Sequence, residues 1–415
     1  MATILLPTIG SSGDVFPMIG LGLELQRRGH HPVIMTNAHF EPMVKPLGLD
    51  FVPVGDEEMY RQVTANPDLW HPARSFNVVA SFAIGGHLRP MYKAITAFDP
   101  RQTVVAASTF VFGARMAHET HGFPYASVHL QPGALRSVID PPIQGPVRLS
   151  AATPLWIKRG WFRLLDGLVI DRTLKPIVNP FRQELGLASA QGFFADFLHA
   201  PQLSLGLFPR WFAPPPADWP PQMQLTGFVH YDGGAQQEMP KELLRFLDAG
   251  EPPLVWTPGT AMRLGQDFFA AALAATQLLG RRSIFVSSHR EQIPPQLPDS
   301  VFHATYAPFG QLLHRAAAMV YHGGIGTLAQ TLAAGIPHLV MPMAHDQPDN
   351  ARRLQRLGVG DFLLPKAFVP QAVAQKLEHL LTNVTVQARC RELAPQVDFA
   401  SALRQTCDAI EGLIP

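Results

Sequence analysis

The sequence predicts an α/β protein built from two Rossmann-like domains, each with a parallel sheet, that face a central cleft. Short apolar runs alternate with amphipathic stretches in the first sixty residues, and the same alternation starts again near residue 254. A proline-rich stretch, WFAPPPADWPP at 211–221, separates the two regions. Alternating strands and helices build parallel sheets. Ligands of such sheets bind outside the carboxyl ends of the strands, so we expect the functional residues there.

The N-terminal half carries the first alternation. Apolar runs predict strands, and amphipathic stretches that end on glycine predict helices. We expect strands at 3–7, 32–36, 51–54, 103–107 and 125–129, helices at 17–28 and 40–47, and a glycine- and serine-rich turn at 10–14. Residues 130–200 are less regular, with proline-rich loops between helical stretches.

The C-terminal half repeats the pattern. We expect strands at 254–257, 283–287, 317–321 and 338–341, and helices at 266–279, 326–334 and 400–413. The resulting domains are an N-terminal Rossmann-like domain (1–212), a proline-rich linker region (213–235), a C-terminal Rossmann-like domain (236–398) and a terminal helix (399–415) expected to pack back on the N-terminal domain. An exposed turn is predicted at Asp232, Gly233 and Gly234, near the boundary.

Composition excludes several classes of protein. The formal net charge is +1 and no basic stripe is present, which argues against a nucleic-acid partner. The only cysteines, Cys390 and Cys407, exclude a disulfide framework and a thiolate zinc site, and they fit a reducing cytosol. The N-terminus lacks the pattern of a signal peptide, and no apolar run reaches the ~18 residues of a membrane span. We therefore expect a cytoplasmic protein, with peripheral contact at the inner face of the membrane left open.

A glycine-rich turn at 322–327, HGGIGT, follows a predicted buried strand and begins a helix. Glycines let backbone N–H groups approach an anion, and a helix N-terminus favours negative charge. His322 can donate a further hydrogen bond to a phosphate oxygen. Neither a Walker motif nor a GxGxxG motif is present, which disfavours an NTPase and a nicotinamide enzyme. The turn therefore predicts a diphosphate site, with tight packing in the absence of any ligand as the alternative.

The surrounding residues resemble the donor-binding signature of the family-1 glycosyltransferases, which use UDP-sugars and dTDP-sugars. That signature opens on an aromatic residue followed by x-Pro, here Tyr306-Ala307-Pro308. It continues through His-x-Gly at 322–324 and closes on Asp346-Gln347. The resemblance implies the GT-B fold, a nucleotide-sugar donor, inversion at the anomeric carbon and no metal or other cofactor. Consistent with this, no Asp-x-Asp metal signature occurs.

The resemblance also implies a role for each donor-side residue. Tyr306 would stack on the base, and the Ala307 backbone would read the edge of the base. Gln330 stands where the family usually has a ribose-binding Glu. His322 and the amides of 323–327 would hold the diphosphate, and Asp346 and Gln347 would bond sugar hydroxyls. The full implied set is Gly259, Thr260, Tyr306, Ala307, His322, Gly323, Gly324, Gly326, Thr327, Gln330, Asp346 and Gln347.

Purely structural explanations remain possible for some of these residues. Tyr306 could belong to the core, and Asp346 could merely cap the helix that follows it. His338 and His345 are interpreted as structural.

The N-terminal loop GSSGD, at 10–14, also resembles the family, where this loop carries the general base. Many members have His there, whereas antibiotic and sterol glycosyltransferases have Gly-Asp, as Gly13-Asp14 does here. A carboxylate can take the proton that an acceptor hydroxyl loses as its oxygen attacks the sugar. Asp14 is therefore the predicted base, with capping of the following helix as the alternative.

Three further stretches resemble the rhamnosyltransferases of bacterial mono-rhamnolipid synthesis: Asn66–Trp70 with 75–76, FPRWFAPPPADWP at 208–220 and AHDQPDNARRLQRLG at 344–358. So does the loop from 10 to 22. The resemblance implies dTDP-L-rhamnose as donor and a 3-(3-hydroxyalkanoyloxy)alkanoic acid as acceptor. Apolar contact with the acyl chains is predicted for Phe16, Trp70, Phe76, Phe82 and Phe110, and Phe112 adds apolar surface in the same half of the chain. Aromatic residues at such positions more often belong to the core.

Other functions remain open on the sequence. One is a UDP-glucose-dependent glucosyltransferase that acts on a sterol, polyketide or other hydrophobic acceptor. A nucleotide-sugar epimerase and a non-catalytic nucleotide-sugar-binding subunit are the alternatives from other classes. Association with the enzyme that forms the acyl acceptor, and the oligomeric state, are also left open.

Overall fold

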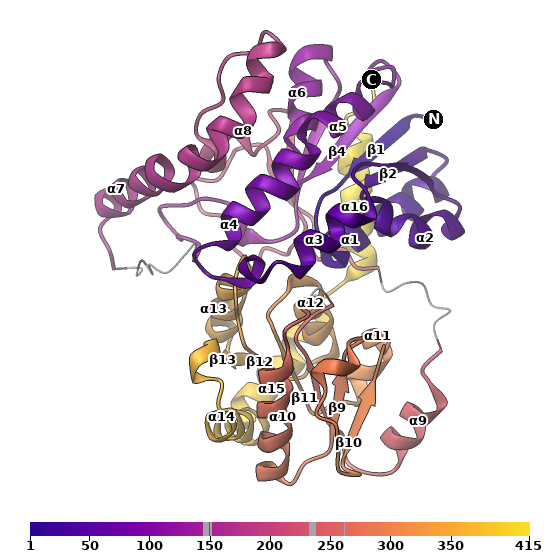
Figure 1. Ribbon diagram of the computed structural model, residues 1–415, viewed down its shortest axis with the longest axis vertical. Helices are drawn as coiled ribbons and strands as arrows, with labels where there is room; N and C mark the ends of the chain where they lie inside the picture. Colours follow the sequence, from indigo (N-terminus) through magenta and orange to yellow (C-terminus); the bar gives the residue numbers. More distant parts are fainter. Residues whose placement is uncertain (144–148, 150–151, 232–237, 261) are drawn as a thin grey trace. The chain divides into compact units, whose positions relative to one another are not determined.

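The computed structural model describes the whole chain except residues 144–148, 150–151, 232–237 and 261. The chain forms two compact units, Met1–Tyr231 with Phe399–Pro415, and Asp232–Asp398. Each unit has one parallel sheet with helices around it (Figure 1). The prediction of two Rossmann-like domains is thus confirmed. The predicted turn at 232–234 lies outside the described residues, and no described helix has the length and apolar character needed to span a membrane.

The sheet of the first unit has the strand order β3-β2-β1-β4-β5-β6-β7, and all of its pairings are parallel. Its strands are β1 (Thr3–Pro7), β2 (His31–Thr36), β3 (Asp50–Pro53), β4 (Thr103–Ser108), β5 (Tyr125–His129), β6 (Leu203–Gly206) and β7 (Met223–Leu225). The first five agree with the predicted strands to within one residue. β7 has only three residues and no apolar run, so the sequence marks its position as part of the linker region.

Helices surround this sheet. Its regular helices are α1 (Ser12–Arg27), α2 (Glu41–Val44), α3 (Glu57–Ala65), α4 (Ser75–Val78), α5 (Gly86–Ile95), α6 (Phe112–His121), α7 (Leu155–Leu165), α8 (Asp171–Glu184) and α16 (Phe399–Glu411). Short 3-10 or π-helical segments are η1 (Ala38–Phe40), η2 (Lys45–Leu47), η3 (Pro67–Trp70), η4 (Val79–Gly85), η5 (Pro132–Ala134), η6 (Asp166–Ile170) and η7 (Phe193–Phe197).

α1 begins at Ser12 rather than at Pro17, where the sequence predicts its start. Ser11 and Asp14 form a capping box, in which each bonds toward the other's backbone, so the helix gains an extra turn at its N-terminus. Part of the predicted turn at 10–14 is therefore helical. This shift places Asp14 in the first turn of α1.

The sheet of the second unit has the order β10-β9-β8-β11-β12-β13, also parallel throughout. Its strands are β8 (Leu254–Thr257), β9 (Ser283–Val286), β10 (Val301–Ala304), β11 (Ala318–Tyr321), β12 (His338–Val340) and β13 (Gly360–Phe362). Its helices are α9 (Lys241–Asp248), α10 (Gln266–Leu279), α11 (Phe309–Leu312), α12 (Ile325–Ala334), α13 (Gln347–Leu357), α14 (Pro370–Thr382) and α15 (Val384–Leu393), with short segments η8 (Arg290–Gln292), η9 (Leu313–Arg315), η10 (Pro365–Ala367) and η11 (Ala394–Gln396).

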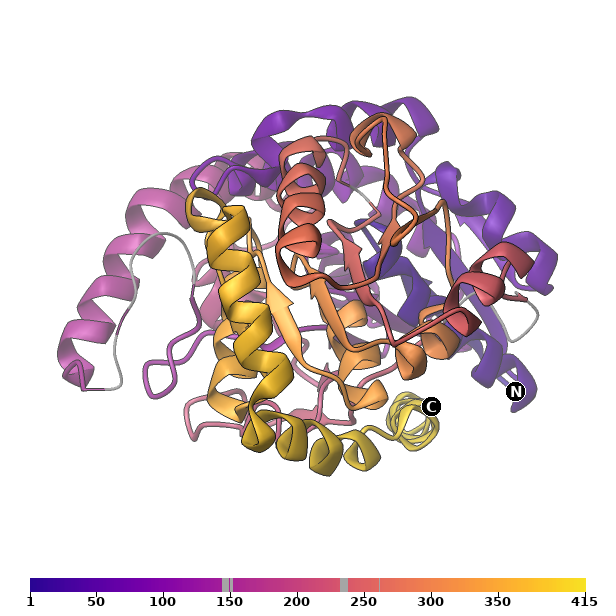
Figure 2. The same ribbon diagram turned by 90° about the horizontal axis from the view of Figure 1, so that it is seen from below.

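The core of the second unit lies between its sheet and the packed pair α10 and α14. Trp256, Phe269 and Phe285 are completely buried in it. Strands buried on both faces are typical of parallel sheets, because helices cover both sides. α16, seen end-on near the C-terminus in Figure 2, belongs to the first unit and packs against α1.

Each sheet contains one point at which the strand order reverses. In the first sheet it lies between β1 and β4, and in the second between β8 and β11. The loops after two such strands turn to opposite faces of the sheet, which opens a crevice at the carboxyl ends of the strands. Asp14 comes shortly after β1, Gly259 follows β8 and His322 follows β11, so the predicted residues lie at these two positions.

Candidate active site

Two glycines enclose His322 at the reversal point of the second sheet. A Cβ atom on Gly259 would lie 2.7 Å from Cε1 of His322, and one on Gly324 would lie 2.5 Å from its Nε2. Both distances are too short for a real contact, so only glycine leaves room for the imidazole ring. Gly259 and Gly323 also have positive φ angles, +97° and +98°, which side chains other than glycine rarely adopt.

The His322 imidazole is uncharged at neutral pH. Burial, with a smaller contribution from nearby His345, lowers the pKa of His322 to about 4. Its Nδ1 atom is buried, and among the described residues it has no hydrogen-bond partner. Buried polar atoms in proteins nearly always have a partner. An unpartnered nitrogen at this position therefore points to a ligand.

The N-terminus of α12 adjoins this ring. Gly324 is its N-cap residue, no side chain caps the helix, and no acid lies in its first turn. The first intrahelical bond that starts from the cap runs from the amide of Leu328 to the carbonyl of Gly324, 3.0 Å away. The preceding amides, at 325–327, are the donors that a helix N-terminus leaves free for an anion. Space beside Gly326 is open, since a Cβ there would meet nothing within 4 Å.

Asn350 connects the glycine turn to Asp346. Its Nδ2 donates to the Gly323 carbonyl at 2.9 Å and to Oδ2 of Asp346 at 2.6 Å, and the side chain is completely buried. The Asp346 carboxylate makes no capping hydrogen bond to α13, which removes the simple capping explanation for this residue. Sequence reasoning missed Asn350, although its place four residues after Asp346, on the same helix face, could have identified it.

Gln347 is almost completely buried, and its Oε1 accepts hydrogen bonds from the amides of Met343 and Ala344 at 2.8 and 3.3 Å. The side-chain oxygen therefore fixes the loop before α13, and within the described structure the amide nitrogen is left for a ligand. His345, two residues earlier, has a positive φ of 60°. Strained backbone of this kind gathers at functional sites.

The remaining donor-side residues lie along the same edge of the sheet. Tyr306 and Ala307 follow β10, which is three strands from β11 in the sheet order. Tyr306 is 47% exposed, so it is not a core residue, whereas Ala307 is buried. Thr260 is exposed in the loop after β8, and Gln330 lies on α12 with its Nε2 3.4 Å from the Gly326 carbonyl. A nucleotide with its diphosphate at α12 could extend along this edge toward Tyr306.

Asp14 makes a capping contact with Ser11, and its pKa is raised above the ordinary range for an aspartate. Its Oδ2 accepts hydrogen bonds from the amide and the hydroxyl of Ser11, at 2.8 and 3.2 Å. Burial nevertheless raises the pKa of Asp14 to about 6, against the lowering effect of these two bonds. Gly10 closes over the carboxylate, since a Cβ there would lie 2.1 Å from Oδ2. Asp14 therefore makes the capping contact that the structural alternative predicts. A carboxylate with a pKa near neutrality also suits a general base.

The structure brings together two of the five predicted acceptor residues. Phe76 and Phe110 both pack against Phe194, with ring centroids 6.1 and 5.6 Å apart. Phe110 has a positive φ of 72°, which is a strained conformation for an aromatic residue. Phe16 lies elsewhere, against Tyr231, and Trp70 and Phe82 lie on η3 and η4.

The aromatic cluster around Phe194 is larger than the sequence predicts. Phe112 packs on Phe193 and Phe197 at 5.8 and 5.2 Å between centroids, and all three are buried. The run FFADF at 193–197, which forms η7, was the available signal. A second pair that the sequence does not reveal is His129 and His199, whose facing ring nitrogens are 3.3 Å apart after β5. Burial lowers the pKa of both rings, that of His199 to about 4, so this pair is neutral.

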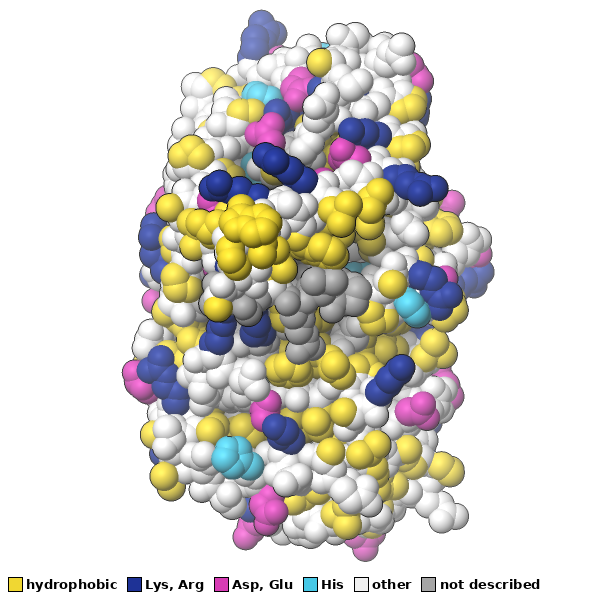
Figure 3. Space-filling model, turned by 90° about the vertical axis from the view of Figure 1, so that its left-hand side faces the viewer, with side chains coloured by type: hydrophobic (Ala, Val, Ile, Leu, Met, Phe, Trp, Pro, Cys, Tyr) yellow, Lys and Arg dark blue, Asp and Glu magenta, His cyan; other side chains and the backbone are white. Residues whose placement is uncertain are grey.

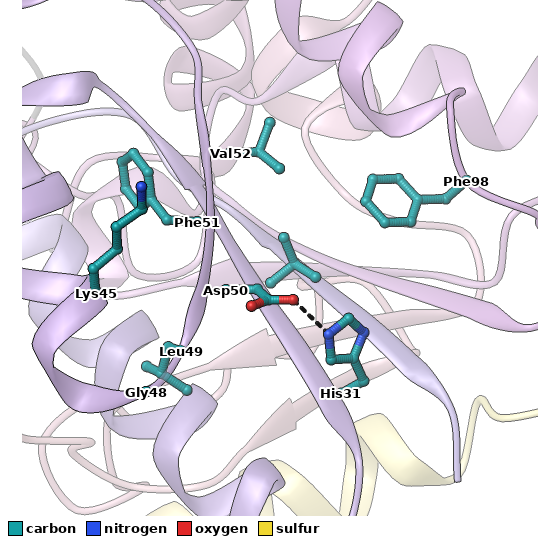
Figure 4. A pocket seen from close by; sticks show the side chains of 9 residues that line it. His31, Lys45, Gly48, Leu49, Asp50, Phe51, Val52 and Phe98 are labelled. Atoms are coloured by element: carbon teal, nitrogen blue, oxygen red, sulfur yellow. Dashed lines mark hydrogen bonds and ion pairs between the residues drawn. The ribbon is translucent and has the colours of Figure 1, made fainter.

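A hollow of about 480 Å³ lies away from all of these residues (Figure 4). It surrounds His31 and Asp50, whose Nε2 and Oδ2 atoms are 2.6 Å apart, at the amino ends of β2 and β3. Ligands of parallel sheets bind at the opposite ends of the strands. We therefore exclude this hollow from the candidate active site.

Comparison with protein families gives two matches. Residues 4–139 match the glycosyltransferase family 28 N-terminal domain. Residues 283–402 match the C-terminal domain of erythromycin biosynthesis protein CIII-like proteins. Asp14 falls inside the first match, and His322 to Asn350 fall inside the second.

Individual proteins resemble the chain over nearly its full length. An O-mycaminosyltylonolide 6-deoxyallosyltransferase of Streptomyces fradiae is 28% identical, over 98% of this chain and 96% of its own length. A sterol 3-beta-glucosyltransferase of Arabidopsis thaliana is 22% identical over 98% of this chain and 67% of its own length.

Solved structures share the fold at lower identity. The glycotransferase of kitacinnamycin superposes with a TM-score of 0.76 at 19% identity, covering 100% of this chain and 99% of the other. The spinosyn rhamnosyltransferase SpnG, complexed with thymidine diphosphate, gives 0.67 at 19% identity, covering 98% and 100%. The full-length relatives described above are glycosyltransferases, which favours a transferase over the epimerase and the non-catalytic subunit. The chain is a glycosyltransferase with the GT-B fold, and two of its segments are similar to the glycosyltransferase family 28 N-terminal domain and to the EryCIII-like C-terminal domain.

Proposed function

We propose that this enzyme transfers L-rhamnose from dTDP-L-rhamnose to the hydroxyl of a 3-(3-hydroxyalkanoyloxy)alkanoic acid, which gives a mono-rhamnolipid. The observation that carries the donor half is the unpartnered Nδ1 of His322 beside the uncapped N-terminus of α12. Such a site suits a diphosphate. The thymidine diphosphate in the structure of the spinosyn rhamnosyltransferase supports a dTDP-sugar. Rhamnose and the lipid acid rest on the resemblance of the segments at 66–76, 208–220 and 344–358.

In the proposed reaction the acceptor oxygen attacks the anomeric carbon while the bond from that carbon to the diphosphate breaks. The proton of the acceptor hydroxyl passes to the Asp14 carboxylate. Since the pKa of Asp14 is raised by burial to about 6, most of this carboxylate is ionised at pH 7 and it can serve as a base. Attack opposite the leaving group inverts the anomeric configuration.

The leaving dTDP gains negative charge as the bond breaks. The amides at 325–327 and the neutral His322 ring would donate hydrogen bonds to its phosphate oxygens, with no metal ion required. Asp346 and the Gln347 amide would bond sugar hydroxyls, and Tyr306 would stack on the base. We expect full activity in excess EDTA, and a strict requirement for added Mg²⁺ would contradict this part of the proposal.

The acceptor half is supported by the aromatic cluster around Phe194 in the first unit. Phe76 and Phe110 are partly exposed and pack on the buried Phe194, and Phe110 lies next to the end of β4, where the sheet order reverses. The names of the two relatives give O-mycaminosyltylonolide and a sterol as their acceptors, and a sterol is hydrophobic. A long acyl acceptor has the same character.

A second candidate is transfer of glucose from UDP-glucose to a sterol. It is favoured by the likeness to the Arabidopsis sterol 3-beta-glucosyltransferase, which extends over 98% of this chain. The two candidates differ in both substrates. Each can therefore be tested by supplying one donor and one acceptor at a time.

The deciding experiment is a panel of dTDP-rhamnose, dTDP-glucose and UDP-glucose against hydroxyalkanoyloxyalkanoic acid, ergosterol and a macrolide aglycone, with products followed by mass spectrometry. We expect a rhamnosyl product and free dTDP only when dTDP-rhamnose and the lipid acid are both present. A glucosyl sterol as the main product would replace the first proposal by the second. Donor hydrolysis that does not depend on any acceptor would reject both.

A further inference from the structure

The segment 155–172, which comprises α7, η6 and the start of α8, exposes apolar side chains that no described residue covers. The exposed fractions are 74% for Trp156, 61% for Leu168, 51% for Leu164, 47% for Leu155, 40% for Val169 and 38% for Ile157. Among the described residues, 17 large hydrophobic side chains are exposed, and these six fall within 15 consecutive positions. Such clustering marks an interaction surface, whereas single exposed apolar residues are ordinary.

The exposed charged side chains of this segment are all positive. Arg159, Arg163 and Arg172 are exposed, and within the described part of the chain none of them has an ion-pair partner. Its acids are neutralised instead, because Asp166 pairs with Arg136 and Asp171 pairs with Lys175. On the face that carries α7, hydrophobic side chains gather with Lys and Arg side chains beside them (Figure 3).

The opposite side of the same segment is anchored in the protein. Phe162 and Ile170 are buried, and the Arg136 guanidinium lies 4.6 Å from the Phe162 ring centroid. Ile170 belongs to the apolar cluster that also contains Phe112 and Phe194. The exposed apolar residues are therefore held on a fixed helical support, and the cluster proposed to bind the acceptor lies directly beneath it.

We propose that this segment is a docking surface for an anionic lipid bilayer. An amphipathic helix with Trp and Leu on one side and arginines beside them lies in the headgroup region, where apolar side chains enter the acyl boundary and cations attract anionic lipids. The absence of unpaired exposed acids favours an anionic membrane over a protein partner, whose surface would carry both signs of charge. Docking would bring a lipid-soluble acceptor to the aromatic cluster, and this last consequence alone rests on the proposed function.

Flotation with vesicles tests the proposal without any substrate. We expect the enzyme to float with vesicles of 70% phosphatidylcholine and 30% phosphatidylglycerol. Binding should fall at least tenfold with pure phosphatidylcholine, or when NaCl is raised to ~0.5 M, because salt screens the arginines. Trp156→Ser combined with Leu168→Ser, and Arg159→Glu combined with Arg163→Glu, should each reduce binding at least tenfold. Absence of wild-type binding to the anionic vesicles would overturn the proposal.

Two controls distinguish membrane docking by this segment from non-specific hydrophobic binding and from self-association. Val384→Ser with Leu278→Ser removes two equally exposed apolar side chains elsewhere, and it should leave flotation unchanged. Circular dichroism confirms that each variant is folded, and sedimentation velocity reports its oligomeric state. If the segment variants float as the wild type does, or if they convert a wild-type dimer into a monomer, the surface is not a lipid-docking site. Failure of the donor and acceptor panel would leave the flotation result standing, so the two proposals fail separately.

Discussion

At the scale of single residues, Asp14 and His322 show how burial prepares side chains for chemistry. Burial of Asp14 raises its pKa to about 6, and burial of His322 lowers its pKa to about 4. Each ring or carboxylate is enclosed by glycines, Gly10 for Asp14 and Gly259 with Gly324 for His322. Near pH 7 the pair therefore offers an ionised base and a neutral hydrogen-bond donor. Both states are the ones that a transfer to a hydroxyl group requires.

The titration of Asp14 predicts the acid limb of the activity profile. Because only the ionised carboxylate accepts a proton, kcat/KM should fall about tenfold per pH unit below a pKa near 6. Asp14→Asn should lower kcat about 10²- to 10⁴-fold and leave donor affinity unchanged. A pH profile of kcat/KM together with calorimetric donor binding checks both expectations. An acid limb that persists unchanged in residual Asp14→Asn activity would assign the titration to another group.

The stability of the same variant distinguishes a base from a helix cap. The folded-state pKa of Asp14, about 6, lies above the ordinary value of 3.8 for this side chain, so ionisation costs folding free energy as pH rises through this window. Asp14→Asn removes that cost and should be as stable as the wild type, or more stable, at pH 7.5. Asp14→Ala should by contrast lose about 1 kcal/mol, because Asn keeps a side-chain oxygen that can accept from the Ser11 amide and Ala does not. Urea unfolding at pH 5 and 7.5 provides the comparison.

His322→Ala should separate binding from folding. Its Nδ1 is buried and has no partner among the described residues, so removal of the ring costs no native hydrogen bond at that atom. Donor affinity should fall about tenfold or more, with little loss of stability. His338→Ala is the matched control, because His338 is also buried but its Nδ1 contacts the Tyr321 hydroxyl at 2.9 Å. The control should lose stability and keep donor affinity, and the reverse pattern would remove His322 from the site.

At the scale of elements, the donor site depends on two helices that start at the same edge of the sheet. α12 supplies free amides, and α13 supplies Asp346 and the buried Asn350 that bonds back to Gly323. A Cβ on Gly323 would lie 2.8 Å from Cγ1 of Val340 and 3.3 Å from the Gln347 carbonyl oxygen. The turn and α13 are thus held at a fixed distance, so the proposed diphosphate and sugar subsites cannot move independently.

Asn350→Ala tests this connection. Loss of both hydrogen bonds frees Asp346 and the Gly323 carbonyl, so the Kd for the donor should rise about 10- to 100-fold. Asn383→Ala is the control, because Asn383 caps α15 through bonds to the amides of Thr385 and Val386, far along the chain from the turn. The control should lose about 1 kcal/mol of stability and keep donor affinity. Equal donor affinities in the two variants would show that Asn350 serves folding alone.

The elements show where sequence reasoning succeeds and where it stops. Strands such as 3–7 and 254–257 are recognisable because a parallel sheet buries both faces and leaves an uninterrupted apolar run. The start of α1 was misplaced, because Pro17 looks like a first-turn residue while Ser11 and Asp14 form the cap. β7 was not predicted, because its half-exposed residues, Met-Gln-Leu, form neither an apolar run nor a clear alternation of apolar and polar residues.

The site residues also divide into those that the sequence identifies and those that only the structure reveals. His322, Gly323 and Asp346 lie within motifs that follow local chemistry, so the sequence identifies them. The pairing of His129 with His199, and of Phe110 with Phe194, joins residues at least 70 positions apart. Contacts of this kind depend on how the strands are ordered in the sheet, which periodicity alone does not report.

At the scale of the whole molecule, the chain leaves the first unit at residue 232 and returns to it at residue 399. The returning helix, α16, is fastened to α1 by Arg28. The Arg28 guanidinium contacts Asp408 at 2.6 Å and Glu411 at 2.8 Å, and it also pairs with Glu24 at 2.9 Å. The Thr406 hydroxyl donates to Oγ1 of Thr226 at 2.7 Å in a buried position. Residues at the two ends of the sequence therefore stabilise one unit together.

Arg28→Ala should loosen α16 without unfolding the second unit. The variant removes the cation that Asp408 and Glu411 share and leaves Glu411 with only its contact to His30, so the helix should open more often. Cys407 reports such opening, because it is completely buried on α16 and its pKa is raised by burial to about 12, so its thiol reacts slowly in the closed state. Cys390, buried in the second unit, is an internal reference within the same molecule. We expect Cys407 to react with a disulfide reagent about tenfold faster in Arg28→Ala, while the rate for Cys390 stays constant.

Arg27→Ala is the matched control for this helix-opening experiment. Arg27 directly precedes Arg28, its side chain is 70% exposed, and among the described residues it forms an ion pair only with Glu24. Exposed pairs of this kind contribute ~0–1 kcal/mol, so the Cys407 rate should stay close to that of the wild type. High salt should accelerate Cys407 in the wild type more than in Arg28→Ala, since only the wild type has the ion pairs to screen. Equal acceleration in the Arg27 and Arg28 variants would show that general destabilisation, rather than the bridge to α16, controls access to Cys407. Faster labelling of Cys390 in step with Cys407 would show that the two units unfold as one.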